Sequence, residues 1–182
     1  MKIPYNEIME LVGLQDDLNH VIATRYEEQT GRPMERTLTK NRINITTELA
    51  EWMNEEAWIF KDWKHRTPND HERRKKSAEE MADVLHFVLS MGIQLRAIYT
   101  IPQNFIIHTS ESSLDPSELY LEILKNVLSI PNTNAILQKR QWFDVLFQFL
   151  MLAELLDFSW EQVYNAYKMK NTTNLERQKN GY

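Results

Sequence analysis

The chain has 182 residues, of which 42% are hydrophobic and 26% charged, and its formal net charge is −5. This length and composition are typical of a single ordinary globular domain and argue against disorder. The negative balance gives no general attraction to nucleic acid or anionic lipid, so we expect no nucleic-acid partner. The sequence contains no cysteine, which excludes disulfides, thiolate metal sites and cysteine nucleophiles.

The sequence also lacks a glycine-rich phosphate loop and a membrane-spanning segment, which excludes further classes of protein. Four glycines in the whole chain leave no glycine-rich phosphate loop, so any phosphate must be handled by side chains and metal. The first residues lack an apolar signal core, and no apolar run reaches the length that spans a membrane. We therefore expect a cytoplasmic protein with no membrane contact.

Apolar residues recur at helical spacing along most of the chain, and no convincing β alternation is present. The expected helices are residues 6–29, 43–64, 71–99, 135–156 and 159–179, with a break over residues 67–70. Residues 81–93 are apolar on nearly every face, which predicts the central helix of a bundle. The predicted fold class is all-α, a helical bundle that forms one domain over residues 1–182.

Residues 100–135 have a different character. Pro102, Pro131 and the serine-rich run 110–113 are loop signals. Between them, residues 115–118 read Asp-Pro-Ser-Glu, which predicts a short helix with an aspartate cap and proline at its first position. We interpret residues 100–135 as a small helical insertion or lid-like segment. A second capping signal, Ser159 with Gln162, predicts the start of the last helix.

The strongest chemical signal is a pair of acidic motifs. Glu48, Glu51 and Glu55 fall within about 60° of arc on one helix, beside an apolar arc that contains Trp52 and Trp63 and is expected to face the core. An E-x-x-D motif at residues 80–83 interrupts the most apolar helix. Carboxylates gathered beside a core favour bound divalent cations, which prefer oxygen ligands. An isolated E-x-x-E is common on solvated helix faces, so the spacing leaves both interpretations open.

Other polar residues permit a functional and a structural interpretation. Lys170, Asn174 and Arg177 share one face of the last helix and suit phosphate oxygens, although cations also stabilise a helix C-terminus. Gln15 and Asn19, one turn apart, could bind the polar edge of a base, or they could cap a helix or lie on the surface. The remaining candidates are expected by default to belong to the core, and they are His86, Phe87 and Trp63.

Five segments together resemble the dimeric all-α dUTPases, a branch of the all-α NTP pyrophosphohydrolases that is frequent in bacterial viruses and their hosts. They are GLQDDLN (13–19), ELAEWMNE (48–55), FKDWK (60–64), EMADVLHF (80–87) and YKMKNTTNLERQKNGY (167–182). The resemblance covers most of the chain but leaves residues 100–135 unmatched. The combination is specific, whereas the E-x-x-E alone is not.

The resemblance implies a homodimeric dUTP diphosphatase that hydrolyses dUTP, and dUDP as well, to dUMP, with two or more Mg²⁺ ions per site. It would supply dUMP and control the dUTP/dTTP ratio. The implied metal ligands are Glu48, Glu51, Glu80 and Asp83, with Glu55 as an outer participant. Water would attack the α-phosphorus, and Glu48 or Glu51 would accept its proton.

The resemblance also implies how the substrate is bound. Gln15 and Asn19 would recognise uracil. On the last helix, Lys170, Asn174 and Arg177 would bind the β and γ phosphates or, across a dimer, complete the site of the partner. The nucleoside pocket would be shaped by Trp63, His86 and Phe87.

Three alternatives stay open at this point. A related hydrolase acting on dCTP or on several NTPs would keep the acids and change the base-binding residues. A di-iron bundle would need a Glu-x-x-His motif on two helices, and only Asp83-x-x-His86 approximates one. A non-catalytic helical regulator with a protein partner would tolerate loss of Glu48 or Asp83.

Overall fold

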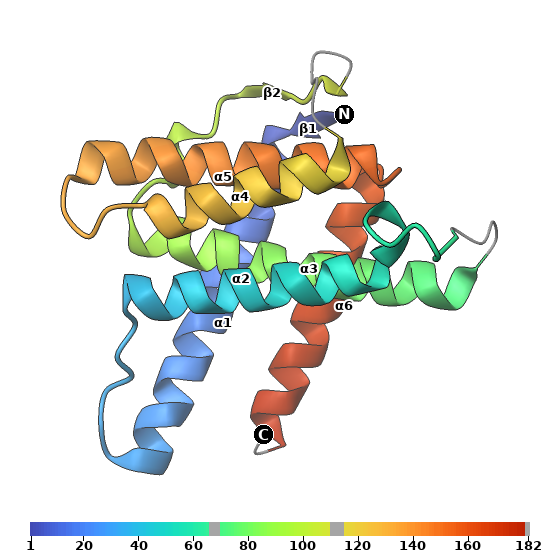
Figure 1. Ribbon diagram of the computed structural model, residues 1–182. Helices are drawn as coiled ribbons and strands as arrows, with labels where there is room; N and C mark the ends of the chain where they lie inside the picture. The colour runs from blue at the N-terminus through green and yellow to red at the C-terminus, as the bar shows by residue number, and fades with distance from the viewer. Residues whose placement is uncertain (66–69, 110–114, 181–182) are drawn as a thin grey trace.

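The computed structural model describes residues 1–65, 70–109 and 115–180. Residues 67–69 of the predicted break over 67–70 lie outside this part, as do the serine-rich run 110–113 and residues 181–182. Six α-helices dominate the described chain (Figure 1). They are α1 (Tyr5–Thr30), α2 (Leu38–Glu55), α3 (His71–Gln94), α4 (Pro116–Ser129), α5 (Ala135–Leu155) and α6 (Trp160–Lys179). The all-α prediction is confirmed.

Helix α3 is the centre of the bundle, as its uninterrupted apolar stretch predicts. It packs against α1, α2, α5 and α6, and its side chains from Met81 to Gly92 are almost all buried. Gly92 allows a close contact with α5, because a Cβ atom there would lie 2.3 Å from Cζ2 of Trp142. The indole of Trp142 is fully buried and donates a hydrogen bond to the Val88 carbonyl at 2.8 Å. Trp142 therefore fixes how α5 lies on α3.

Replacing Gly92 with alanine is expected to destabilise the protein by about 2 kcal/mol or more, because the indole or α5 itself must shift. Urea unfolding monitored by circular dichroism measures this change. Gly13→Ala is the matched control, since the surroundings of an added Cβ there are empty to 4 Å and the residue is exposed on α1. That control should be neutral or stabilising by about 0.5–1 kcal/mol, because alanine favours a helix. Equal unfolding midpoints for the two variants would contradict the packing described.

Helix α2 ends earlier than its pattern predicts, at Glu55 rather than Lys64. The next residue, Glu56, is buried, and its carboxylate accepts hydrogen bonds from Ser77 of α3 and from the Trp58 indole, both at 2.6 Å. This cross-link turns the chain away from the helix axis into a 3₁₀ turn (Ala57–Ile59). Trp63, predicted to face the core, is instead 76% exposed. That prediction was wrong.

The other helix boundaries follow local signals more closely. Asp115 and Ser159 each form the capping box that the sequence predicts, with reciprocal bonds to Glu118 and Gln162. Helix α3 ends at Gln94, five residues before the expected end, and is followed by a 3₁₀ turn (Ile98–Thr100). Helices α1, α5 and α6 lie within a few residues of their predicted ranges.

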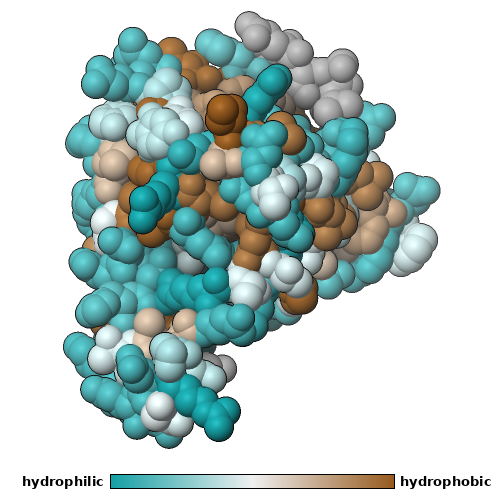
Figure 2. Space-filling model, turned by 90° about the vertical axis from the view of Figure 1, so that its left-hand side faces the viewer, coloured by the Kyte–Doolittle hydropathy of each residue, from teal (hydrophilic) through white to brown (hydrophobic). Residues whose placement is uncertain are grey.

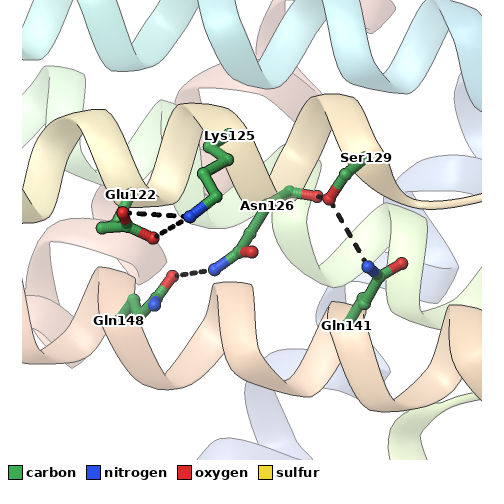
Figure 3. A network of polar contacts seen from close by, with 6 residues as sticks. All are labelled: Glu122, Lys125, Asn126, Ser129, Gln141 and Gln148. Atoms are coloured by element: carbon green, nitrogen blue, oxygen red, sulfur yellow. Dashed lines mark hydrogen bonds and ion pairs between the residues drawn. The ribbon is translucent and has the colours of Figure 1, made fainter.

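The segment from 100 to 135 is joined to the rest of the molecule at both ends. Strand β2 (Asn104–Ile106) pairs antiparallel with β1 (Lys2–Pro4). This pairing is short, and no alternation of apolar and polar residues in the sequence predicted it. Helix α4 buries Leu119, Ile123 and Val127 in the common core. Figure 3 shows a polar seam beside this core, in which α4 and α5 exchange side-chain hydrogen bonds. That this segment is an insertion or lid stays a prediction.

Polar side chains dominate much of the surface. Figure 2 shows hydrophilic groups over the lower part of one face, with hydrophobic groups gathered higher up. Among the described helices, none is both long and apolar enough to cross a membrane.

Candidate active site

Helices α2 and α3 run side by side and bring three acidic side chains together (Figure 1). Glu48 of α2 and Glu80 and Asp83 of α3 each offer a carboxylate oxygen, and these three atoms lie within 4.8 Å of one another. Residues three apart on a helix are neighbours, which is why both α3 acids point the same way. Three of the four predicted metal ligands thus meet. Glu51 is exposed and lies outside this group, one turn further along α2.

The three carboxyl groups of this acid cluster (Glu48, Glu80 and Asp83) all have raised pKa values. Burial raises the pKa of the Glu48 carboxyl to about 7, and the charges of the neighbouring carboxylates add to the rise. The pKa values of Glu80 and Asp83 are also raised, again first by burial. Lys170 of α6 opposes this, since its Nζ lies 2.5 Å from Oδ2 of Asp83. All-oxygen ligands in one partly buried place fit hard divalent cations, which would offset the repulsion.

The raised pKa of Glu48 predicts a pH-dependent stability. Between its ordinary value of 4.5 and about 7, the folded protein binds more protons than the unfolded chain, so this group lowers stability as the pH rises. We expect Glu48→Gln to gain in Tm over the parent protein from pH 5 to pH 8 in EDTA, because glutamine stays neutral. Differential scanning fluorimetry measures the difference, in which the effects of titrating groups remote from the acid cluster cancel. Mg²⁺ should reduce it at pH 8, and a pH-independent difference would contradict the prediction.

Two members of the acid cluster, Glu48 and Asp83, line a pocket of about 460 Å³ that is bounded by α1, α2, α3, α6 and the α1–α2 connection. Most of the residues singled out in the sequence line it. They are Gln15, Asn19, Glu48, Asp83, His86, Phe87, Lys170, Asn174 and Arg177. Trp63 is not among the lining residues, and the role in a nucleoside pocket that the resemblance implies for it stays a prediction.

A buried chain of hydrogen bonds forms one wall of the pocket. The Gln15 carbonyl oxygen accepts from the Tyr167 hydroxyl at 2.8 Å and lies 2.7 Å from Nδ1 of His86. The Gln15 amide nitrogen donates to Oδ1 of Asn19 at 3.0 Å, and the Ser90 hydroxyl donates to the same oxygen at 3.1 Å. Gln15 and Asn19 are therefore neither caps nor surface residues. Among the described residues, Oδ1 of Asn19 accepts both of these hydrogen bonds, so Nδ2 remains as the donor atom of a side chain that lines the pocket.

His86 belongs to this wall as a neutral side chain. It is only 4% exposed, and its ring stacks on Tyr167 with the centroids 4.0 Å apart. Burial, followed by the charge of Lys170, lowers its pKa to about 3. Because the carbonyl oxygen of Gln15 only accepts, the proton is assigned to Nδ1. His86 is not in the group of potential metal ligands found among the described residues, and its default interpretation as a hydrogen-bonded core histidine is the better one.

Helix α6 supplies the positive side of the pocket. Lys170, Asn174 and Arg177 line it at one face of the helix, and the charge of Arg177 also acts on the carboxylate of Asp83. Cations placed against an acid cluster can hold the phosphates of a substrate beside the metal that the acids bind.

Sequence reasoning missed the wall formed by the α1–α2 connection. Met34, Glu35 and Arg36 line the pocket there, and the Arg36 guanidinium donates to the backbone carbonyl of Asn19. Nothing in the local pattern marks Arg36. Asn44 was detectable, because it lies one helical turn before Glu48 on the same face of α2.

Comparison with known proteins agrees with this geometry. A family model described as dUTPase matches residues 7–182, and the match runs across residues 100–135. A search of curated proteins found no match.

Proposed function

The chain belongs to the dimeric all-α dUTPase family and is a dUTP diphosphatase, and on this premise we propose how its residues carry out the reaction. In this proposal the enzyme requires Mg²⁺, hydrolyses dUTP to dUMP and pyrophosphate, and also accepts dUDP. It thereby supplies dUMP and limits the dUTP/dTTP ratio. The observation that carries the proposal is the acid cluster, which lies against the cationic face of α6 at one pocket.

We place two or more Mg²⁺ ions on the acid cluster, with Glu51 completing the ligand set or acting just outside it. Bound there, the ions would lower the pKa of water and neutralise charge on the phosphates. Glu48 and Glu51 are the candidates for accepting the proton of the attacking water. Glu51 is the freer of the two, because its carboxylate stands outside the cluster of three.

The phosphates are assigned to α6. Lys170 reaches the acid cluster, so it can contact an oxygen shared with the metal ions, while Arg177 offers a planar pair of donors. Asn174 can donate to the same phosphate chain. Family membership supports a homodimer, in which these residues act within their own subunit or complete the site of the partner.

The base is assigned to the opposite wall. Asn19 offers an amide donor that suits a carbonyl oxygen of uracil, with Gln15 and His86 behind it. Cytosine carries an amino group at C4 in place of that carbonyl, and an amide donor would repel it. Phe87 lines the same pocket and is assigned to the deoxyribose.

A substrate panel tests the proposal. Purified protein is incubated with dUTP, dCTP, dTTP or UTP, in Mg²⁺ and in EDTA, and products are separated by ion-exchange chromatography. We expect dUMP and pyrophosphate from dUTP in Mg²⁺ alone, and little product from the other three. Turnover of dCTP or of all four nucleotides would preserve the carboxylate site and overturn the uracil assignment. No turnover at all would favour a regulatory protein.

A further inference from the structure

Tyr167 lies behind the pocket, and the proposed reaction mechanism assigns it no role. Its side chain is 0% exposed, it does not line the pocket, and its hydroxyl donates to the carbonyl oxygen of Gln15 at 2.8 Å. Burial raises the pKa of the Tyr167 hydroxyl far above its ordinary value, so the group keeps its proton at any physiological pH. It is a permanent donor in a buried place.

A side-chain amide has a donor end and an acceptor end, and its hydrogen-bond partners decide which end faces which way. Two groups donate to the carbonyl oxygen of Gln15 and so fix its direction, the Tyr167 hydroxyl and Nδ1 of His86. The Ser90 hydroxyl donates to Asn19 at the other end of the chain. Reversing Gln15 would turn its NH₂ group toward Tyr167, and the buried tyrosine hydrogen would lose its acceptor. A buried donor without a partner is costly, so the recorded direction is favoured.

The direction of this chain determines what the substrate meets. With Gln15 as recorded, its NH₂ group occupies Oδ1 of Asn19, and the NH₂ group of Asn19 is presented to the pocket. With Gln15 reversed, its carbonyl oxygen would face Asn19, which would then turn and present Oδ1. The first arrangement suits the C4 carbonyl of uracil, and the second suits the C4 amino group of cytosine.

We propose that Tyr167 is a positioning residue for base selection: by holding Gln15 in one amide orientation, it fixes Asn19 as a donor and thereby favours uracil over cytosine. The inference rests on the proposed function, because it takes the wall of Gln15 and Asn19 as the base site. It concerns the choice between two bases and leaves the chemistry at the phosphates unchanged.

The test compares binding of dUMP and dCMP without metal, so that it does not depend on turnover. Titrations followed by NMR or calorimetry give both Kd values for the parent protein and for Tyr167→Phe. We expect the parent to prefer dUMP, and the variant to lose about tenfold of that preference, as for one lost hydrogen bond. If Tyr167 served packing alone, the variant would bind both nucleotides more weakly by the same factor, and the ratio of the two Kd values would not change. The ratio of kcat/KM for dUTP and dCTP should move with the binding ratio.

Tyr164→Phe is the matched control. Tyr164 lies on the same helix, but its hydroxyl donates to Glu10 at the surface, and this variant should keep the preference of the parent. Ser90→Ala removes the donor at the other end of the chain and should also reduce the preference, which keeps the test valid if Tyr167→Phe does not fold.

The possible results separate the two claims. A parent protein that binds dCMP as well as dUMP would overturn the uracil assignment of the proposed function. If the parent prefers dUMP and the Tyr167→Phe and Ser90→Ala variants keep the same preference, the proposed function stands and the positioning role of Tyr167 is overturned.

Discussion

Replacing Asp83 with asparagine is expected to lower kcat for dUTP by about a thousandfold, the largest effect we expect from a single substitution. Asparagine keeps the shape of the side chain but removes the charge that a divalent cation needs. Asp83 also forms an ion pair with Lys170 at 2.5 Å where α3 and α6 meet. The variant therefore loses this ion pair as well as the charge that would bind the cation. Initial-rate kinetics at saturating Mg²⁺, with a thermal melt to verify folding, measure the loss.

Glu79→Gln is the control for Asp83→Asn. Glu79 lies on the same helix, adjacent to a cluster residue, but it is exposed and pairs only loosely with Lys75, at 3.9 Å. Its removal should change kcat less than about twofold, because exposed ion pairs contribute little. An Asp83→Asn protein with more than about a tenth of the parent activity would show that the acid cluster is not the metal site.

The second large effect is expected for Lys170→Met, which should lower kcat/KM for dUTP by about a hundredfold. Methionine preserves most of the apolar stem, so the loss reports the ammonium group. That group pairs with Asp83 at the edge of the acid cluster, and its residue lines the pocket, where it can neutralise a phosphate as charge develops. We expect a smaller loss for dUMP binding than for turnover, because dUMP lacks the β and γ phosphates.

Lys168→Met controls for the removal of a cation from α6. Lys168 pairs with Glu10 at 2.8 Å on the outer side of the helix, away from the pocket. It should retain nearly full activity. If Lys170→Met and Lys168→Met behave alike, the assignment of phosphates to this face of α6 is wrong.

Features encoded by neighbouring residues were predictable from the sequence. The capping boxes at Asp115 and Ser159 mark two helix starts because each requires only four consecutive residues. The apolar stretch after Glu80 identifies α3 as central, since no exposed helix could carry it. The acid motifs lie on two such well-marked helices, so three of the four predicted ligands meet in the structure.

Features that depend on contacts distant in sequence were not predictable. Helix α2 ends beside Glu56, whose carboxylate accepts a hydrogen bond from Ser77, 21 residues further along the chain. The apolar pattern that continues beyond Glu56 therefore predicts a longer helix than the structure has. Trp63 lies on that misleading continuation, which is why its predicted burial was wrong. Tyr167 looks like any aromatic core residue until its hydroxyl is seen against Gln15, 152 positions away.

Hydrolysis of dUTP in ¹⁸O-labelled water tests the central claim most directly, namely that this pocket directs water to the α-phosphorus with the help of Mg²⁺. Mass spectrometry of the products locates the label. We predict one ¹⁸O atom in dUMP, none in pyrophosphate, and no reaction in EDTA or with Asp83→Asn. Label in pyrophosphate, release of dUDP and phosphate, or undiminished turnover in EDTA would contradict the account.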